Sequence, residues 1–226
     1  MAIMNMNNID PPDTLEPSAP SNDSIYNTLI DELAEKGWCV HDQVLTSSTL
    51  SGLLNMCETL WEQGEFIQAG VGRGNKLQVK TELRSDKVLW MNPEDSSEGT
   101  APYYDFLEGL RLKFNQELYL GLDSWEGHFA IYPEGAFYKK HLDQHKDTQA
   151  RQITVILYLN DDWKDSDGGQ LRLYKDAECK EWIDIDPQMG RLIVFLSERF
   201  WHEVLPANRE RRSITGWFRK DTLSNY

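Results

Sequence analysis

The sequence predicts a mainly β protein with flanking helices, in which a double-stranded β-helix (jelly-roll) core is covered on the outside by helices from the N-terminal half. From residue 125 onward, short apolar or alternating runs are separated by turn residues, which is typical of barrel strands. Before residue 120, apolar residues recur at helical spacing. The 226 residues, 40% of them hydrophobic, are enough for one sizeable core. We therefore expect one domain over residues 25–226, with helical support at 25–120 and the jelly-roll core at about 65–220.

The N-terminal half contains the expected tail and helices. Residues 1–24 are rich in Asn, Pro, Asp and Ser, so we expect them to be disordered. An apolar stripe predicts a helix at 25–36 that Gly37 ends, and a short strand follows at 38–40. A second helix should begin near Thr46 or Ser47 and run to about residue 60, and a third should span 103–119. Residues 66–80 include Gly70, Gly72 and Gly74 without a following helix, which predicts a mobile loop.

Charge and cysteine content exclude several classes of protein. The net charge of −14 disfavours a nucleic-acid surface, which needs clustered Lys and Arg. No apolar run is long enough for a membrane span, and no signal peptide is recognisable, so we expect a cytoplasmic protein without a membrane partner. The three cysteines lack CxxC spacing, which argues against a disulfide scaffold or a zinc ribbon and favours buried free thiols.

Three residues have the pattern of a metal site. Residues 125–138 predict two strands around a turn, and the second continues into His141-Leu142-Asp143. Alternate residues of a strand share a face, so His141 and Asp143 should point the same way. His202 follows the apolar run 191–196, a predicted buried strand. Two imidazoles and one carboxylate can fill three adjacent positions around iron(II) and leave three for a chelating cosubstrate and dioxygen.

A predicted strand near the C-terminal end supplies a candidate anion-binding residue. Alternation places Arg211, Ser213, Thr215 and Trp217 on one face. Arg binds carboxylates through two parallel hydrogen bonds, so an inward Arg beside a His₂Asp site suggests a dicarboxylic cosubstrate. If the register slips by one residue, Arg212 takes this role.

With these motifs the chain resembles the 2-oxoglutarate- and iron(II)-dependent dioxygenases, and among them the prolyl 4-hydroxylases of the oxygen-sensing type and their bacterial relatives. The resemblance covers roughly residues 65–220. Besides the triad, it rests on five collinear segments, at residues 83–90, 151–160, 168–173, 202–207 and 213–218.

The resemblance implies roles for individual residues. The triad would hold iron(II), and Arg211 would bind the distal carboxylate of 2-oxoglutarate. The other implied cosubstrate residues are Tyr158 and Thr215 through their hydroxyls, Tyr132 near the metal, and Leu171, Ile156 and Val204 as walls. The residues implied on the substrate side are Arg84, Asp86, Arg151, Trp217 and Trp90. The segment at 66–80 would be a lid over bound substrate.

The activity implied is hydroxylation of a proline in a protein or peptide, coupled to conversion of 2-oxoglutarate and O₂ to succinate and CO₂, with ascorbate as reductant. Because bacterial members of this branch hydroxylate a translation elongation factor, such a GTPase is the first candidate partner. Three alternatives stay open: hydroxylation of free proline or another small molecule, a non-enzymatic sensing or binding module, and a nucleic-acid demethylase. The last is disfavoured because that branch carries a second Arg where this chain has Trp217.

Several residues also have purely structural interpretations. Trp90 and Trp217 could be packing aromatics, and Tyr158 could be a buried residue with a satisfied hydroxyl. His145 has the spacing to pair with the first triad histidine on a zinc-binding helix, but the strand context disfavours this. His41 has no partner for metal binding in the sequence and should lie at the surface. One departure from the animal relatives is His128, which replaces an apolar residue that faces the cosubstrate.

Overall fold

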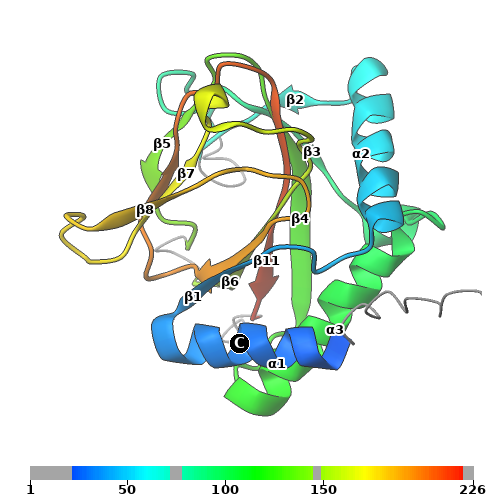
Figure 1. Cartoon of the computed structure of the whole chain (residues 1–226), viewed down its shortest axis with the longest axis vertical. Helices are drawn as coiled ribbons and strands as arrows, with labels where there is room; N and C mark the ends of the chain where they lie inside the picture. Colours follow the sequence, from blue (N-terminus) through cyan, green and yellow to red (C-terminus); the bar gives the residue numbers. More distant parts are fainter. Residues whose placement is uncertain (1–21, 72–77, 145–148, 221–226) are drawn as a thin grey trace, which may run out of the picture.

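The computed structural model describes residues 22–71, 78–144 and 149–220 and contains two antiparallel sheets with three α-helices (Figure 1). The major sheet has seven strands in the order β1-β9-β6-β11-β4-β3-β2, and the minor sheet has four in the order β5-β10-β7-β8. The helices are α1 (Asn22–Lys36), α2 (Ser47–Glu62) and α3 (Ala101–Leu118). The strands are β1 (Trp38–His41), β2 (Ile67–Gln68), β3 (Lys87–Trp90), β4 (Ser124–Tyr132), β5 (Tyr138–His141), β6 (Arg151–Tyr158), β7 (Leu171–Tyr174), β8 (Trp182–Ile185), β9 (Leu192–Leu196), β10 (His202–Val204) and β11 (Arg211–Arg219). The predicted jelly-roll core with outer helices is confirmed.

Strand alternation divides the buried side chains of the major sheet between two cores. An outer core lies between this sheet and the helices, and an inner core lies between the two sheets. On β6, Val155 and Leu157 belong to the outer core, whereas Ile156 and Tyr158 belong to the inner core. Because both faces of β6 and β9 are covered, these two strands contain nearly continuous apolar runs, at 153–158 and 192–196. The inner face is the one that can carry a site.

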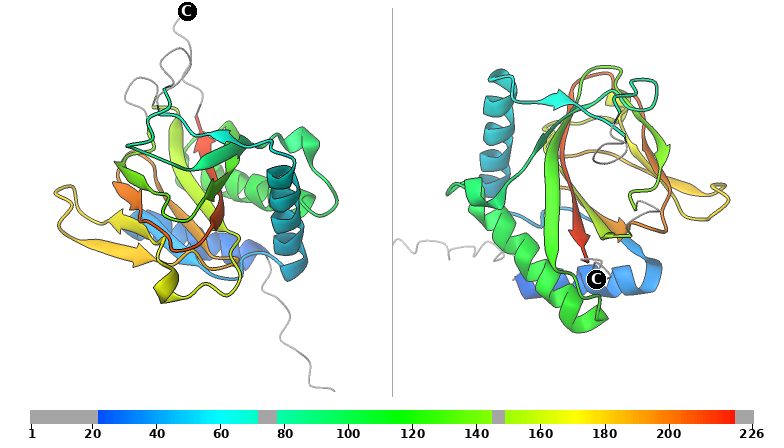
Figure 2. Two further views of the ribbon diagram at one scale, coloured as in Figure 1. Left: turned by 90° about the horizontal axis from the view of Figure 1, so that it is seen from above. Right: turned by 180° about the vertical axis from the view of Figure 1, so that it is seen from behind.

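The helices cover only the outer face of the major sheet. Figure 1 shows α1 and α3 crossing beneath it and α2 standing beside β2 and β3, and in the views of Figure 2 none of the three enters the space between the sheets. Buried residues of all three helices, such as Leu29, Leu53 and Phe106, lie in the outer core. The helices therefore leave the inner face of the major sheet to pack against the minor sheet. In the described parts of the chain, no helix is both long and apolar enough to cross a membrane.

The helix boundaries differ slightly from the sequence-based expectations. α1 begins at Asn22, so residues 22–24 are helical and not part of a disordered tail, while residues 1–21 lie outside the described part. Gly37 ends α1 with a positive φ of 83°, as expected. Thr46 caps α2 by accepting a hydrogen bond from the Thr49 N–H. Cys39 and Cys57 are buried free thiols, but Cys179 is only partly buried.

Two predicted segments are wrong in detail. β5 ends at His141, so Asp143 lies beyond the strand, in a bend, and does not follow strand alternation. The predicted loop at 66–80 begins with β2, which pairs with β3, and Val71 forms a β-bridge with Gln78. Residues 72–77, the centre of the predicted lid, lie outside the described residues.

Two glycines make room for the indole of Trp125, against which α3 packs. Gly127 and Gly216 are cross-strand partners on β4 and β11, and the indole of Trp125 lies over both. A Cβ atom at Gly216 would lie 2.5 Å from Trp125 Nε1, far inside van der Waals contact. The Trp125 ring in turn meets the Tyr103 and Tyr104 rings edge-on, at centroid distances of 6.2 and 6.1 Å.

We therefore expect Gly216→Ala to lower the free energy of unfolding by about 1–3 kcal/mol, the usual cost of overpacking. Urea unfolding of the metal-free protein measures this quantity. Gly99→Ala is the matched control, because a Cβ atom there would meet no atom closer than 3.4 Å. Equal stabilities of the two variants would show that the indole can move away at no cost.

Candidate active site

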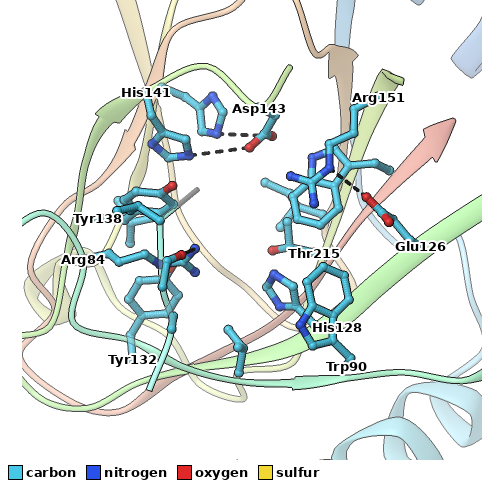
Figure 3. Close-up of a pocket in the computed structure, with 18 of the residues that line it drawn as sticks. Arg84, Trp90, Glu126, His128, Tyr132, Tyr138, His141, Asp143, Arg151 and Thr215 are labelled. Atoms are coloured by element: carbon cyan, nitrogen blue, oxygen red, sulfur yellow. Dashed lines mark hydrogen bonds and ion pairs between the residues drawn. The ribbon is translucent and has the colours of Figure 1, made fainter. Parts of the chain in front are cut away.

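A cavity of about 410 Å³ lies between the two sheets (Figure 3). Its walls come from both sheets and from the segment that leads into β3. Of the fifteen residues predicted from the sequence to form the site, all but Tyr158 and Asp86 line the cavity directly. Those two lie behind wall residues and contact them, as described below.

The three candidate metal ligands converge at one end of the cavity. The ligand atoms of His141, Asp143 and His202 all lie within 4.8 Å of one another. Asp143 Oδ1 is 3.6 Å from His141 Nε2, and Asp143 Oδ2 is 3.5 Å from His202 Nε2. His141 and His202 are direct partners across the β5–β10 pair, which brings their rings to a centroid distance of 4.2 Å. Although Asp143 lies past the strand, it reaches the same point.

Backbone carbonyls fix which imidazole nitrogen is free to bind metal. His141 Nδ1 is 2.8 Å from the Lys139 carbonyl, and His202 Nδ1 is 3.1 Å from the Phe200 carbonyl. A carbonyl can only accept, so each Nδ1 carries the proton and each Nε2 offers its lone pair to the shared point. This second layer of hydrogen bonds is the usual support of a metal-binding histidine. The donor set and its orientation fit iron(II).

The Asp143 carboxylate is held in its charged form. The side chain is buried and accepts a 2.8 Å hydrogen bond from Thr154 Oγ1, which also contacts Ser197 Oγ at 2.8 Å. Burial raises the pKa of Asp143, but His202 and His141 outweigh it, so the pKa lies well below its usual range. Burial also lowers the pKa of His202 to about 4. A neutral imidazole beside a carboxylate is the protonation state that a divalent cation requires.

Arg211 lies on the inner face of β11 as a buried cation without a carboxylate partner among the described residues. Its Nε donates to the Gly169 carbonyl at 2.9 Å, and its Nη1 lies 3.5 Å from Ser213 Oγ. An unpaired buried cation is costly, so this arrangement fits an anionic ligand. Arg212 points to the outer face, where it pairs with Glu58 and Glu210 at 3.3 and 2.7 Å. Of the two arginines, only Arg211 lines the cavity.

Tyr158 supplies a second group that fits a carboxylate near Arg211. The Arg211 guanidinium lies 4.8 Å from the centroids of both the Tyr158 and Tyr132 rings. The Tyr158 hydroxyl is fully buried and has no hydrogen-bond partner among the described residues, contrary to the interpretation of a satisfied core tyrosine. Burial raises its pKa, so the hydroxyl keeps its proton and can donate to an anion. Together the two groups fit the distal carboxylate of 2-oxoglutarate.

Other parts of the cavity wall carry paired charges and aromatic rings. Arg84 makes a bidentate ion pair with the fully buried Asp86, at 2.7 and 2.5 Å. Arg151 lies over the Trp217 ring at 3.4 Å from its centroid and is held by Glu126 at 2.8 Å. The Trp90 side chain is 52% exposed at the rim, so it is no core aromatic.

Sequence reasoning missed several wall residues and placed others correctly. Alternation along β6 would have added Thr154 to the inward set with Ile156 and Tyr158. Tyr138, Glu126 and Arg219 also line the cavity and were not singled out. His41 lies partly exposed, as expected, and its Nε2 is 3.1 Å from Glu32 Oε1. His145 lies outside the described residues.

His128 is buried in the cavity wall between two indoles. Its ring centroid is 5.1 Å from that of Trp90 and 5.5 Å from that of Trp217, and Nδ1 lies 3.2 Å from the Phe129 carbonyl. The pKa of His128 is lowered to about 4, mainly by burial and also by the nearby Arg84 and Arg151, with Asp86 opposing them.

This shift predicts loss of stability in mild acid. In the unfolded chain His128 binds a proton near pH 6.5, but in the folded chain only near pH 4. Between these values the unfolded state holds more protons, so the free energy of unfolding falls as the pH drops, by about 3 kcal/mol in total. Between pH 6.5 and 5, we expect the thermal midpoint of metal-free His128→Met to fall less than that of the unmutated protein. His41→Gln should show the same fall as the unmutated protein. An unchanged slope in His128→Met would contradict this assignment.

Comparisons with known proteins agree with this geometry. The family described as the 2OG-Fe(II) oxygenase superfamily matches residues 127–219. A Pseudomonas putida prolyl-4-hydroxylase structure is 40% identical with a TM-score of 0.79, covering 87% of this chain and 100% of that one. A Trichoplax adhaerens prolyl hydroxylase, solved with a peptide fragment of the hypoxia-inducible factor oxygen degradation domain, is 28% identical with a TM-score of 0.78, covering 88% and 90%.

Among curated proteins, the hypoxia-inducible factor prolyl hydroxylase of Caenorhabditis elegans is 34% identical over 206 residues. The match covers 86% of this chain but only 28% of the worm protein, so the chain spans a minor part of that relative. The chain belongs to the 2OG-Fe(II) oxygenase superfamily. Within it, the chain lies in the prolyl hydroxylase branch.

Proposed function

We propose that this protein is an iron(II)- and 2-oxoglutarate-dependent prolyl 4-hydroxylase that acts on a protein or peptide. The observation that carries the proposal is the placement of two complementary features in one cavity. A His-Asp-His cluster occupies one part, and a buried arginine without a carboxylate partner among the described residues occupies another. A ligand that chelates the metal and ends in a second carboxylate satisfies both.

The residues of the chain would bind and orient the reactants. His141, Asp143 and His202 would hold iron(II) through two Nε2 atoms and a carboxylate. Arg211 and the Tyr158 hydroxyl would bind the distal carboxylate of 2-oxoglutarate. The further proposed cosubstrate contacts are Thr215, Tyr132, Leu171, Ile156 and Val204, all of which line the cavity.

When bound, iron(II) and 2-oxoglutarate supply the oxidising chemistry, in which O₂ is consumed, 2-oxoglutarate becomes succinate and CO₂, and a substrate C–H bond gains an oxygen atom. The contribution of the chain is to position the target carbon and to exclude water. Apolar walls such as Leu171 and Ile156 serve that exclusion, because both side chains are buried in the inner core.

The open side of the cavity suits a proline within a peptide. Arg151, Trp217 and Trp90 present flat aromatic and guanidinium surfaces there, and Arg84 is fixed by Asp86. The T. adhaerens relative was solved with a peptide fragment, which supports a peptide substrate here by analogy. A translation elongation factor is the first candidate partner. Cytoplasmic location and ascorbate as reductant stay predictions, as does the single domain over residues 25–226.

Mass spectrometry of a host-cell extract tests the proposal. The extract is incubated with iron(II), 2-oxoglutarate and either the unmutated protein or its His202→Ala variant, and peptides that gain one oxygen are sought. We expect a proline that is oxidised only by the unmutated protein. If no peptide differs while succinate still forms, free proline or another small molecule becomes the favoured substrate. If succinate is absent as well, the enzymatic proposal is wrong.

A further inference from the structure

A column of three stacked groups leads to the candidate ligand His141. The Tyr138 ring lies parallel to the His141 imidazole, with a centroid distance of 3.6 Å and an interplanar angle of 15°. The Arg84 guanidinium lies 4.2 Å from the centroid of the same Tyr138 ring. Figure 3 shows Tyr138 between the two, with His141 on one side and Arg84 on the other. One face of the His141 imidazole is therefore covered by the Tyr138 ring, and the Tyr138 ring is covered in turn by the Arg84 guanidinium.

The far end of the column is fixed to the fold. Asp86 is fully buried and takes both ends of the Arg84 guanidinium fork. Arg84 Nη1 also donates to the Gly70 carbonyl at 3.3 Å. The backbones of Arg84 and Tyr138 form a β-bridge, flanked by hydrogen bonds from Ser85 N to the Phe137 carbonyl and from Lys139 N to the Leu83 carbonyl, at 3.0 and 2.8 Å. Tyr138 thus rests on a support that cannot shift without breaking a buried ion pair.

A bulge in the β5–β10 pair brings Tyr138 and His141 to the same side. His202 pairs with His141 and Val204 pairs with Tyr138, so three steps along β5 match two steps along β10. Simple alternation would place residues three apart on opposite faces. The additional residue in β5 is a β-bulge, a feature that redirects side chains near functional sites.

The two histidines differ in how they are held. His202 is 3% exposed and lies in the inner core, with its ring 4.9 Å from that of Phe195. His141 is the last residue of β5, and its side chain is 17% exposed. Packing restrains His202 from several sides, whereas His141 relies on its Nδ1 hydrogen bond, the His202 ring and the Tyr138 ring. The Tyr138 ring is therefore one of three restraints on the His141 ring among the described residues.

We propose that Tyr138, supported by the Arg84–Asp86 ion pair, is a positioning residue that holds the His141 imidazole in its metal-binding orientation. The inference rests on the proposed metal site. The stacked ring blocks rotation of the imidazole about its Cα–Cβ bond, so that Nε2 stays directed at Asp143. The ion pair keeps the support electrically neutral, because an unpaired guanidinium near the site would repel a divalent cation.

Calorimetric titration of the metal-free full chain with Mn(II) tests the role without turnover. Loss of a group that orients a metal ligand typically weakens metal binding about 10- to 100-fold. We expect Tyr138→Leu to raise the dissociation constant about 10-fold and Tyr138→Phe, which keeps the ring, to stay within about twofold. Tyr174→Leu is the matched control, since Tyr174 also carries a cation near its ring, Lys140 at 5.1 Å, but its aromatic neighbour is Trp182, which it meets edge-on at 6.3 Å.

The electron paramagnetic resonance spectrum of bound Mn(II) gives a second readout, which should broaden in Tyr138→Leu and not in Tyr138→Phe. If Tyr138→Leu does not fold, Tyr138→Met replaces it as a flexible residue of similar length. Unchanged affinity in the ring-less variants would overturn the inference, as would equal losses in Tyr138→Phe and Tyr138→Leu. If the unmutated protein itself binds no Mn(II), the proposed metal site is wrong, and the positioning role is wrong with it.

Discussion

Replacing Arg211 by alanine is expected to weaken 2-oxoglutarate binding roughly 100- to 1,000-fold, while Arg212→Ala leaves it unchanged. Removing one partner of a buried, hydrogen-bonded charge pair costs about 3–4 kcal/mol, and each 1.4 kcal/mol is about tenfold in affinity. Arg211 is 1% exposed in the cavity wall, so its pairing with a carboxylate would be little screened by water. Calorimetric titration with 2-oxoglutarate in the presence of Mn(II) measures the affinity without turnover.

The same substitution should leave the fold intact. No carboxylate among the described residues pairs with Arg211, so its removal strands no buried anion. Its Nε partner is the Gly169 carbonyl, and loss of that bond costs about 1–3 kcal/mol. Arg212→Ala is a sharp control because it removes a neighbouring guanidinium that pairs with Glu58 and Glu210 on the other face. Loss of binding in Arg212→Ala instead would assign the carboxylate site to the other face of β11.

Regular strands explain why much of the inner face could be predicted. β11 pairs with β4 in unbroken register from Arg211 to Arg219. Alternation therefore holds along its length, and Arg211, Thr215 and Trp217 all line the cavity as expected. The sequence leaves Arg212 as an alternative, because a register slip of one residue would bring it to the inner face. In the structure Arg211 lines the cavity, whereas Arg212 pairs with Glu58 on the outer face.

Irregular backbone explains what the sequence did not reveal. Asp143 reaches the cluster from a bend after β5, and Tyr138 reaches His141 through a bulge, so neither follows the period of two. The HxD spacing still pointed to the right residues, because it reflects metal chemistry rather than strand geometry. Long-range partners such as Glu126 for Arg151 depend on the pairing of distant strands, which local patterns do not encode.

The first residue of α1 could not be predicted from composition either. The polar composition of residues 22–24 resembles the preceding tail, yet these residues form the first turn of the helix. An acidic residue, Asp23, lies in that turn, where the helix dipole favours negative charge. Composition is a property of a whole segment and does not locate a single helical turn. The N-terminal end of α1 depends instead on the packing of the residues after it, here Tyr26 and Leu29 in the outer core.

His202→Ala is expected to abolish the stabilisation of the protein by divalent metal and all hydroxylation. Metal that binds only the folded state raises the free energy of unfolding by about 2.7 kcal/mol at a concentration of 100 times its dissociation constant. With His202 removed, the His₂Asp cluster loses one of its three protein ligands. Thermal unfolding with and without Mn(II) should therefore show an upward shift of the midpoint in the unmutated protein and none in the variant.

His41→Ala is the control, because that histidine pairs with Glu32 near the surface and lies outside the cluster. It should keep the full Mn(II)-dependent shift. In the metal-free state, His202→Ala removes a ring from the inner core and leaves Asp143 with the Thr154 hydroxyl and His141 as partners. Some loss of basal stability is therefore expected, and the decisive quantity is the difference between the metal-loaded and metal-free midpoints. A variant that retains this difference would show that Mn(II) binds elsewhere, and the His-Asp-His assignment would then fail.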